Sequence, residues 1–259
     1  MKDNREKEPE IKVKSVKKAL DVLNCFIKKQ PLGVTEISEM LGLYKSNVYD
    51  ILTTLTAMEY LTQVKETGKY ELGIGAARLG NAVGDRFGFH KLAGRHIHEI
   101  ADEVGETVYL TTLMGTSVLY LDVAVPSNER SPAIVSSVRN NMEPLHCTSC
   151  GKAMLACMPD SFVKEYLSMP MEKFTEYTIT DPVELSKEIA KIRERGYSRD
   201  QMEYSVGISC VAVPIVVHGN LQGVISISAP SPRMEDARVM QFVEILRQHV
   251  RQIESDLSK

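Results

Sequence analysis

Apolar residues recur at helical spacing in three short segments near the start of the chain, and two extended runs follow them. The spacing predicts helices over residues 15–29, 35–42 and 45–58 and strands over 60–66 and 69–73. Each helix has one apolar stripe that can face a common core. On the first helix, the residues expected to be buried are Val16, Ala19, Leu20, Leu23, Phe26 and Ile27.

Three short helices followed by a hairpin predict a winged helix-turn-helix. Residues 42–45, Gly-Leu-Tyr-Lys, separate the second and third helices by the tight glycine-containing turn that this motif requires. The two extended runs meet at Thr67-Gly68, which predicts the wing hairpin. Thr35 is placed to cap the second helix. The motif favours DNA binding, although helical spacing alone leaves a small helical domain without a DNA role as the alternative.

The pattern changes after residue 105, where β-branched residues become frequent and alternate with polar ones. Turn signals at Gly115-Thr116 and at His218-Gly219-Asn220 predict two further hairpins. A helix over 184–195 should end at Gly196. The last helix carries one apolar stripe, formed by Val239, Val243, Leu246, Val250, Ile253 and Leu257.

These elements predict an α+β fold with two structured domains. We expect a disordered tail over 1–12, a winged helix-turn-helix domain over 13–75, a linker helix over 76–90 and a second domain over 91–259. The second domain should be an antiparallel sheet with helices packed on it.

Composition narrows the class of protein. The chain has 43% hydrophobic and 25% charged residues and a formal net charge of −3, which excludes a strongly basic nucleic-acid coat but not a local basic face. It shows no apolar run of membrane-spanning length and no signal-peptide pattern, so we expect a cytoplasmic protein with no membrane partner. Five cysteines, an odd number, argue against a disulfide scaffold and fit a reducing compartment.

Residues 146–157, His-Cys-Thr-Ser-Cys-Gly-Lys-Ala-Met-Leu-Ala-Cys, raise three chemical possibilities. A phosphate loop fails, because His146 and Ala153 occupy its required glycine and hydroxyl positions. A structural zinc site needs more ligands than the pair of Cys147 and Cys150 supplies, so zinc binding by this segment stays the minor alternative. A cysteine nucleophile is weak too, because adjacent side chains on a strand point to opposite faces. No carboxylate lies at an evident orienting spacing from the other histidines, so we expect neither catalysis nor a metal or other cofactor.

The same segment also predicts a strand that turns into a helix near Thr148 or Ser149. The free backbone N–H groups in the first turn of such a helix can bind an anion. Gly151 would allow close packing of the backbone there. We therefore expect a site for a small anionic ligand.

Over nearly its whole length, about Ser15 to Leu257, the chain resembles the IclR family of bacterial transcriptional regulators. The resemblance rests most firmly on two motifs, Ser-Cys-Gly-Lys-Ala-Met-Leu-Ala at 149–156 and the strand pair at 207–228. It implies a winged helix that binds a double-stranded operator, a linker helix, a GAF-like domain that binds a small metabolite, and assembly into dimers or tetramers.

The resemblance also implies the effector-binding residues, which are Ser149, Cys150, Asp200, Cys210, Ser226 and Ser228. Ser226 and Ser228 lie two residues apart on a strand, so their hydroxyls share one face. Asp200 has the wrong sign to meet a carboxylate and would instead accept a hydrogen bond from a ligand hydroxyl. The expected effector is therefore a small carboxylate such as a hydroxy acid, a sugar acid or an aromatic hydroxy acid. Cys150 departs from the small residue usual in this turn.

DNA contacts are expected from the start of the third helix, which meets base edges and phosphates in this motif. Asp50 stands where family members often have Arg, so contacts there should differ. The apolar faces of the first helix and the linker offer surface for assembly into a homodimer or tetramer. The expected DNA-binding residues on this helix are Lys45, Ser46, Asn47 and Tyr49. Thr35 and the wing residues Lys65 and Lys69 are expected to contact the DNA backbone.

Overall fold

The computed structural model describes residues 11–84, 88–127 and 141–259. The chain divides into two compact units, Met1–Arg86 and Phe87–Lys259, and each is described by itself. Residues 1–10 of the expected tail lie outside the described residues.

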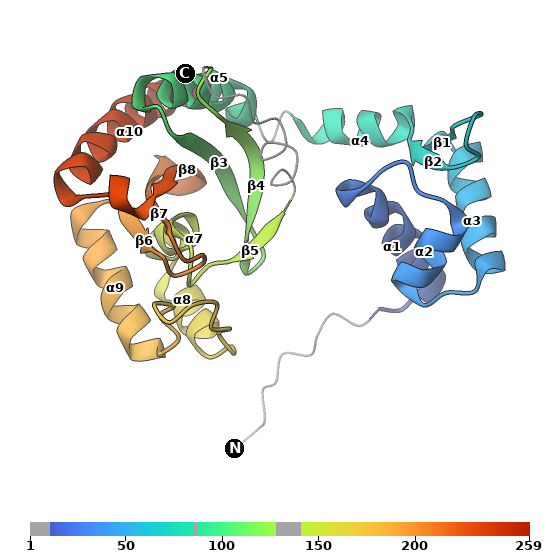
Figure 1. Cartoon of the computed structure of the whole chain (residues 1–259), viewed down its shortest axis with the longest axis horizontal. Helices are drawn as coiled ribbons and strands as arrows, with labels where there is room; N and C mark the ends of the chain where they lie inside the picture. The colour runs from blue at the N-terminus through green and yellow to red at the C-terminus, as the bar shows by residue number, and fades with distance from the viewer. Residues whose placement is uncertain (1–10, 85–87, 128–140) are drawn as a thin grey trace. The chain divides into compact units, whose positions relative to one another are not determined.

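The first unit is a winged helix-turn-helix, as the sequence predicts (Figure 1). Its wing is an antiparallel pair in which Leu61 faces Leu72 and Gln63 faces Tyr70. Leu32 adds a bridge to Tyr70, which ties the wing to the segment between the first two helices. The elements are α1 (Lys14–Lys28), α2 (Val34–Leu41), α3 (Lys45–Ala57), β1 (Leu61–Gln63), β2 (Tyr70–Leu72) and α4 (Ile74–Gly84).

The face of α1 that packs differs from the expected one. Phe26 is buried as predicted, but Val16, Leu20 and Ile27 are about half exposed, and Val22 and Cys25 take their place in the core. The expectation was wrong for those three residues because α1 carries apolar side chains on two sides. Periodicity reveals that a stripe exists but cannot choose which of two stripes meets α2 and α3.

The capping prediction for α2 is also corrected. Helix α2 begins at Val34 with Gly33 as its N-cap, so Thr35 lies inside the first turn and is exposed. The carboxylate of Glu36 accepts the Gly33 N–H at 2.9 Å, which satisfies the helix end without a threonine cap. At the other end Gly42 adopts a left-handed φ of 64° and forms the turn into α3.

The second unit is an α+β domain built on a six-stranded sheet with the order β5-β4-β3-β8-β7-β6. All neighbouring strand pairs are antiparallel, and the hairpins lie at the two predicted turns. Helix α9 ends at Gly196, as expected. The elements are α5 (Gly88–Val104), β3 (Thr107–Met114), β4 (Ser117–Ala124), β5 (Met142–Pro144), α7 (Ser149–Cys157), α8 (Asp160–Leu167), α9 (Pro182–Arg195), β6 (Ser198–Gln201), β7 (Ile208–Val217), β8 (Asn220–Pro230), the 3-10 helix η1 (Ser231–Arg233) and α10 (Asp236–Leu257).

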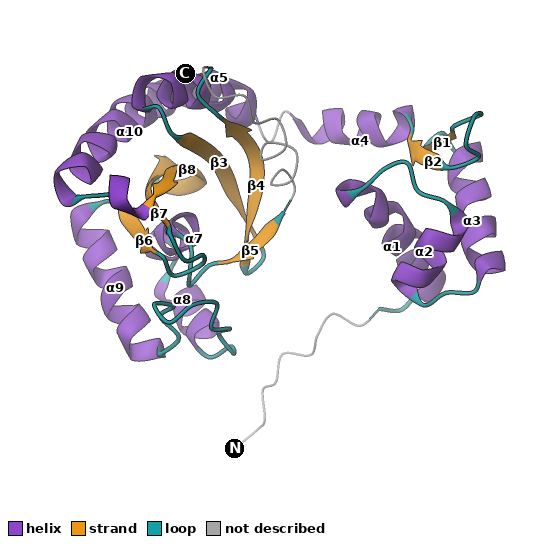
Figure 2. Cartoon of the chain, in the orientation of Figure 1, coloured by secondary structure: helices purple, strands orange, loops and turns teal. Residues whose placement is uncertain are grey.

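Helices cover both faces of this curled sheet (Figure 2). On one face α5 and α10 pack through residues such as Ile97 and Leu246, and the predicted stripe of α10 is buried except for the partly buried Leu257. On the other face α7, α8 and α9 pack through residues such as Met154 and Leu185. The sheet therefore separates two apolar cores, and α7 lies on the inside of its curve. Among the described helices, none is long and apolar enough to cross a membrane.

Candidate functional site: an effector cavity and a DNA-binding surface

A cavity of about 160 Å³ lies between the start of α7 and the inner face of the sheet. Five of the six expected effector-binding residues, from four separate elements, line it. Cys150 is instead buried beneath the cavity, where its thiol interacts with Ser226, Thr111 and Ser149. The lining residues are Tyr109, Tyr120, Asn141, Glu143, Thr148, Ser149, Asp200, Tyr204, Ser205, Ile208, Cys210, Ser226 and Ser228.

Strand register explains why these residues meet. Asp200 on β6 faces Cys210 on β7, and Cys210 faces Ser228 on β8. Two residues before Ser228 on β8, and on the same side of the sheet, Ser226 pairs with Tyr109 on β3. Because side chains two residues apart share a face, these positions form adjacent rows on the inner surface of the sheet.

The first turn of α7 forms the opposite wall. Thr148 is the N-cap, and its hydroxyl oxygen accepts the Gly151 N–H at 3.0 Å. Ser149 and Cys150 are the first two residues of α7, so their N–H groups belong to its amino-terminal end, where the helix dipole favours negative charge. A Cβ atom at Gly151 would lie 2.3 Å from the Cα of Leu145, so this helix can approach the segment that follows β5 only with glycine there. The predicted helix start and the packing role of Gly151 are both confirmed.

Asp200 is the most perturbed carboxyl group of the cavity. Burial raises its pKa to about 7, although its carboxylate accepts backbone hydrogen bonds that favour the charged form, including one from Glu203 N at 2.7 Å. Lys152 and Glu203 form a buried ion pair nearby. Both protonation states of Asp200 are therefore accessible near neutral pH, so its carboxyl group can either donate or accept a hydrogen bond.

Several lining residues were missed by sequence reasoning. Tyr109 and Tyr120 stack edge to face with ring centroids 5.3 Å apart, and burial raises the pKa of Tyr109 to about 12, so it stays a hydroxyl donor. Glu143 and Tyr204 interact with each other at the cavity. The alternation of side chains along a strand predicts on which face of the sheet each tyrosine lies. Only the pairing of strands distant in the sequence shows that this face lines the cavity.

The nucleophile and zinc alternatives for residues 146–157 find no support in the geometry. Burial raises the pKa of Cys147 to about 12, which disfavours a reactive thiolate. Both ring nitrogens of His146 are engaged, one with the Tyr166 hydroxyl at 3.1 Å and the other with the Glu172 carbonyl at 2.9 Å. Within the described part of the chain, His146 and the cysteines form no three-ligand group suited to a metal ion.

The predicted DNA-binding residues lie at the surface of the first unit. Tyr44, the N-cap of α3, is 83% exposed and was not predicted. Lys65 on the wing is exposed, whereas Lys69 forms an ion pair with Glu36 at 2.9 Å. The four predicted residues on the first two turns of α3, Lys45, Ser46, Asn47 and Tyr49, are all exposed.

A winged helix-turn-helix joined to a separate α+β unit defines a DNA-binding transcriptional regulator. The chain belongs to the IclR family: the family's helix-turn-helix domain matches residues 15–65, and the bacterial transcriptional regulator IclR C-terminal domain matches residues 82–255. Proteins of this family are regulators of transcription and not enzymes.

The similarity to known relatives extends over almost the full length of the chain. The HTH-type transcriptional regulator BhcR of Paracoccus denitrificans is 31% identical over 93% of this chain and 86% of its own. The crystal structure of the Thermotoga maritima IclR has 31% identity and a TM-score of 0.75, and the match covers 95% of this chain and 99% of that one. An IclR homologue from Microbacterium hydrocarbonoxydans, solved in complex with 4-hydroxybenzoate, shares the fold at 24% identity with a TM-score of 0.82, over 94% of this chain and 98% of that one.

Proposed function

We propose that this regulator binds an operator through α3 and the wing, and that a small organic acid in the α7 cavity changes its operator occupancy. The observation that carries this proposal is the convergence of polar residues from β3, α7, β6, β7 and β8 on one cavity. We further propose that the protein acts in the cytoplasm, since an operator-binding regulator must reach the bacterial chromosome.

The size of the cavity restricts the effector. A cavity of about 150 Å³ holds a molecule as large as benzene, and the volume here is about 160 Å³. The effector is therefore compact, with about one aromatic ring or a short carbon chain. An aromatic hydroxy acid or a short hydroxy acid fits better than a long fatty acid.

The chemistry of the walls orients such a ligand. Its carboxylate would lie at the N–H groups of Ser149 and Cys150, where the helix dipole stabilises negative charge. Ser226 and Ser228 would add hydroxyl donors along the sheet. Asp200 and Glu143 would accept hydrogen bonds from ligand hydroxyl groups at the other end. A homologue of the same fold was solved in complex with 4-hydroxybenzoate, an aromatic hydroxy acid, and this supports the proposed ligand class.

Assembly is the second part of the proposal. Val13, Val16, Leu20 and Ile27 are each about half exposed and lie on one side of α1, and Ile74 and Leu79 of α4 are exposed as well. A single winged helix contacts too few base pairs for useful specificity. We infer that these apolar positions are covered in a homodimer or tetramer that binds a pseudo-palindrome.

Gel shift against the DNA that flanks its own gene tests operator binding. A panel of small acids, each paired with its neutral amide, then tests the effector class by release or tightening of the complex. We expect an acid to act at lower concentration than its amide, because only the charged form gains from the helix dipole.

The double variant Ser226→Ala with Ser228→Ala tests the site. It should fold and bind the operator, but it should lose about 0.5–1.5 kcal/mol of effector binding per hydrogen bond, or up to about 3 where the bond is charge-assisted. Ser209→Ala is the matched control, since Ser209 is a buried strand serine that bonds Ser231 and does not line the cavity. Operator release by amides alone, or equal effector affinity in both variants, would contradict the proposed carboxylate site.

A further inference from the structure

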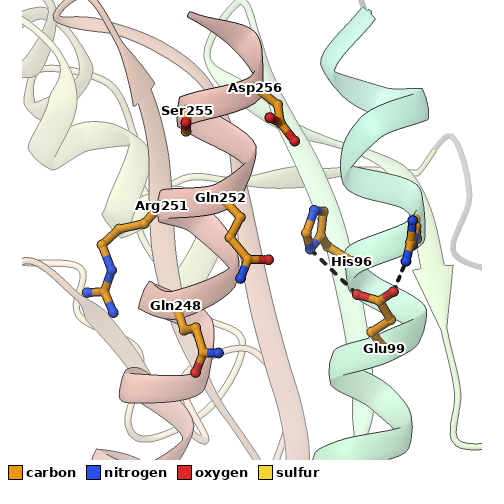
Figure 3. A pocket seen from close by; sticks show the side chains of 8 residues that line it. His96, Glu99, Gln248, Arg251, Gln252, Ser255 and Asp256 are labelled. Carbon is orange, nitrogen blue, oxygen red and sulfur yellow. Dashed lines mark hydrogen bonds and ion pairs between the residues drawn. The ribbon is translucent and has the colours of Figure 1, made fainter.

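Two histidines from distant parts of the chain meet between α5 and α10, on the face of the sheet opposite to α7. Nδ1 of His96 lies 2.9 Å from Nδ1 of His249, and the two rings meet edge to face. Glu99, one turn after His96 on α5, directs a carboxylate oxygen toward both rings. Figure 3 shows His96 and Glu99 on α5, with Gln252 and Asp256 on the side of α10 that faces them. The sequence analysis found no carboxylate at an evident orienting spacing from these histidines, whereas in the structure Glu99 lies within 4.0 Å of both.

The three atoms form a compact triangle. Oε2 of Glu99 lies 3.8 Å from Nδ1 of His96 and 4.0 Å from Nδ1 of His249. In a tetrahedral zinc site with bonds of about 2.0–2.1 Å, neighbouring ligand atoms are about 3.3–3.4 Å apart. The three observed separations, 2.9, 3.8 and 4.0 Å, lie on both sides of that value. Small side-chain rotations that move each ligand atom by a few tenths of an ångström would therefore bring all three to bonding distance from one ion.

Neighbouring groups hold these ligands in the orientation that a metal requires. Nε2 of His249, on the far side of its ring, faces Oε2 of Glu103 at 3.8 Å. A carboxylate at that position favours the tautomer with the proton on Nε2, which leaves the Nδ1 lone pair pointing at the cluster. Nε of Arg95 donates to Oε1 of Glu99 at 2.8 Å, so the other carboxylate oxygen stays directed at the histidines.

The cluster is also accessible from solvent. His96 and Glu99 line a groove of about 530 Å³ whose walls are formed by side chains of α5 and α10, among them Gln252 and Asp256. The two histidine side chains are only 12% and 11% exposed, whereas Glu99 is 43% exposed. An ion can therefore enter from the groove and keep water as its fourth ligand.

We propose that His96, Glu99 and His249 form a binding site for a divalent transition-metal ion, with zinc as the best match. Two imidazole nitrogens and one carboxylate suit zinc and its neighbours in the first transition row, whereas calcium and magnesium require oxygen ligands. A bound ion would cross-link α5 to α10, the two helices that cover this face of the sheet. The site is separate from the effector cavity and does not depend on the proposed function.

Zinc titration of the tag-free, chelator-treated full-length protein tests this proposal directly. Calorimetry should show one zinc per protomer, and zinc but not magnesium should raise the melting temperature, because an ion that binds only the native state stabilises it. With cobalt in place of zinc, the absorption spectrum should lack thiolate-to-metal charge transfer.

Variants distinguish this site from other zinc-binding groups. His249→Gln and Glu99→Gln should abolish or greatly weaken stoichiometric binding, and Glu99→Gln should fold, because its side chain is 43% exposed. Glu103→Gln should weaken zinc affinity by about 10–100-fold, as is typical of carboxylates that orient a ligand. His98→Gln is the matched control, because His98 is exposed on the same helix outside the cluster.

Three results would overturn the proposal. The first is no zinc binding by the wild-type protein, which would leave the two histidines as a structural hydrogen-bonded pair. The second is binding that survives Glu99→Gln and His249→Gln unchanged. The third is a cobalt spectrum with thiolate charge transfer, which would move the ion to the cysteines.

Discussion

Asp200 combines deep burial with a position on the wall of the effector cavity, being 4% exposed and having a pKa raised to about 7. The raised pKa means that the folded protein holds this proton more tightly than the unfolded chain does. The contribution of Asp200 to stability is therefore greatest below its ordinary pKa of 3.8 and declines as the pH rises through about 7. Effector binding should follow the same titration, because the ionised carboxylate repels a carboxylate ligand.

The Asp200→Asn substitution should remove this pH dependence. The amide oxygen can still accept the Glu203 N–H, so the turn that follows β6 should keep its structure. We expect the decline in melting temperature between pH 4 and 7 to be smaller in the variant, and its affinity for a small acid to change less with pH. Thermal melts and ligand titrations across this range measure both effects.

The exposed residue Glu176 provides the control for this experiment, since Glu176→Gln removes a carboxylate of the same unit away from the cavity. Its pH profile should match that of the wild type. A profile of Asp200→Asn that also matches the wild type would show that Asp200 does not titrate in this range.

At the scale of elements, α3 and the wing should contribute to DNA binding in different ways. Asn47 lies in the first turn of α3, where a side chain reaches base edges, and Lys65 lies on the wing, where it meets phosphates. Asn47→Ala should cost about 1–3 kcal/mol on the operator and relax specificity at one position. Lys65→Ala should weaken binding to all sequences alike and reduce the salt slope by about 1.

Gel shifts on operator and random DNA at several salt concentrations separate the two effects. Lys187→Ala serves as the control for charge loss, because Lys187 is exposed on α9 in the other unit. A loss of specificity with Lys65→Ala, or a uniform loss with Asn47→Ala, would reverse the assignment. Lys69 should contribute less to phosphate binding than Lys65, since its charge is already paired with Glu36.

For the whole molecule, assembly should depend on the exposed apolar side of α1. Leu20 is 53% exposed and is not part of the core of its unit, so Leu20→Glu should leave the winged helix folded. A charge at an interface must be desolvated, and we expect the variant to sediment as a smaller species and to bind the operator more weakly.

Lys18→Glu is the matched control, because it introduces the same side chain two residues away and therefore on the other side of the helix. It should assemble like the wild type. Sedimentation of the wild type as a monomer at micromolar concentration, both free and on DNA, would contradict the proposed assembly.

Local sequence determined the elements that depend on short-range physics. Helical spacing and strand alternation predicted the three helices and the hairpin of the first unit and the two hairpins of the second. They could do so because an element with one buried face repeats apolar residues at its own period. Gly42 and Gly196 end their helices where predicted, and Thr148 caps α7. Each of these features depends on residues within a few positions of one another.

Tertiary structure decided what depends on distant segments. The choice between two apolar sides of α1 was made by α2 and α3. The pKa of Asp200 comes from burial, which no local pattern reveals. His96 and His249 meet across 153 positions in the sequence, because α5 and α10 pack on the same face of one sheet. Spacing along the chain carries no record of that contact, so the candidate metal site follows only from the fold.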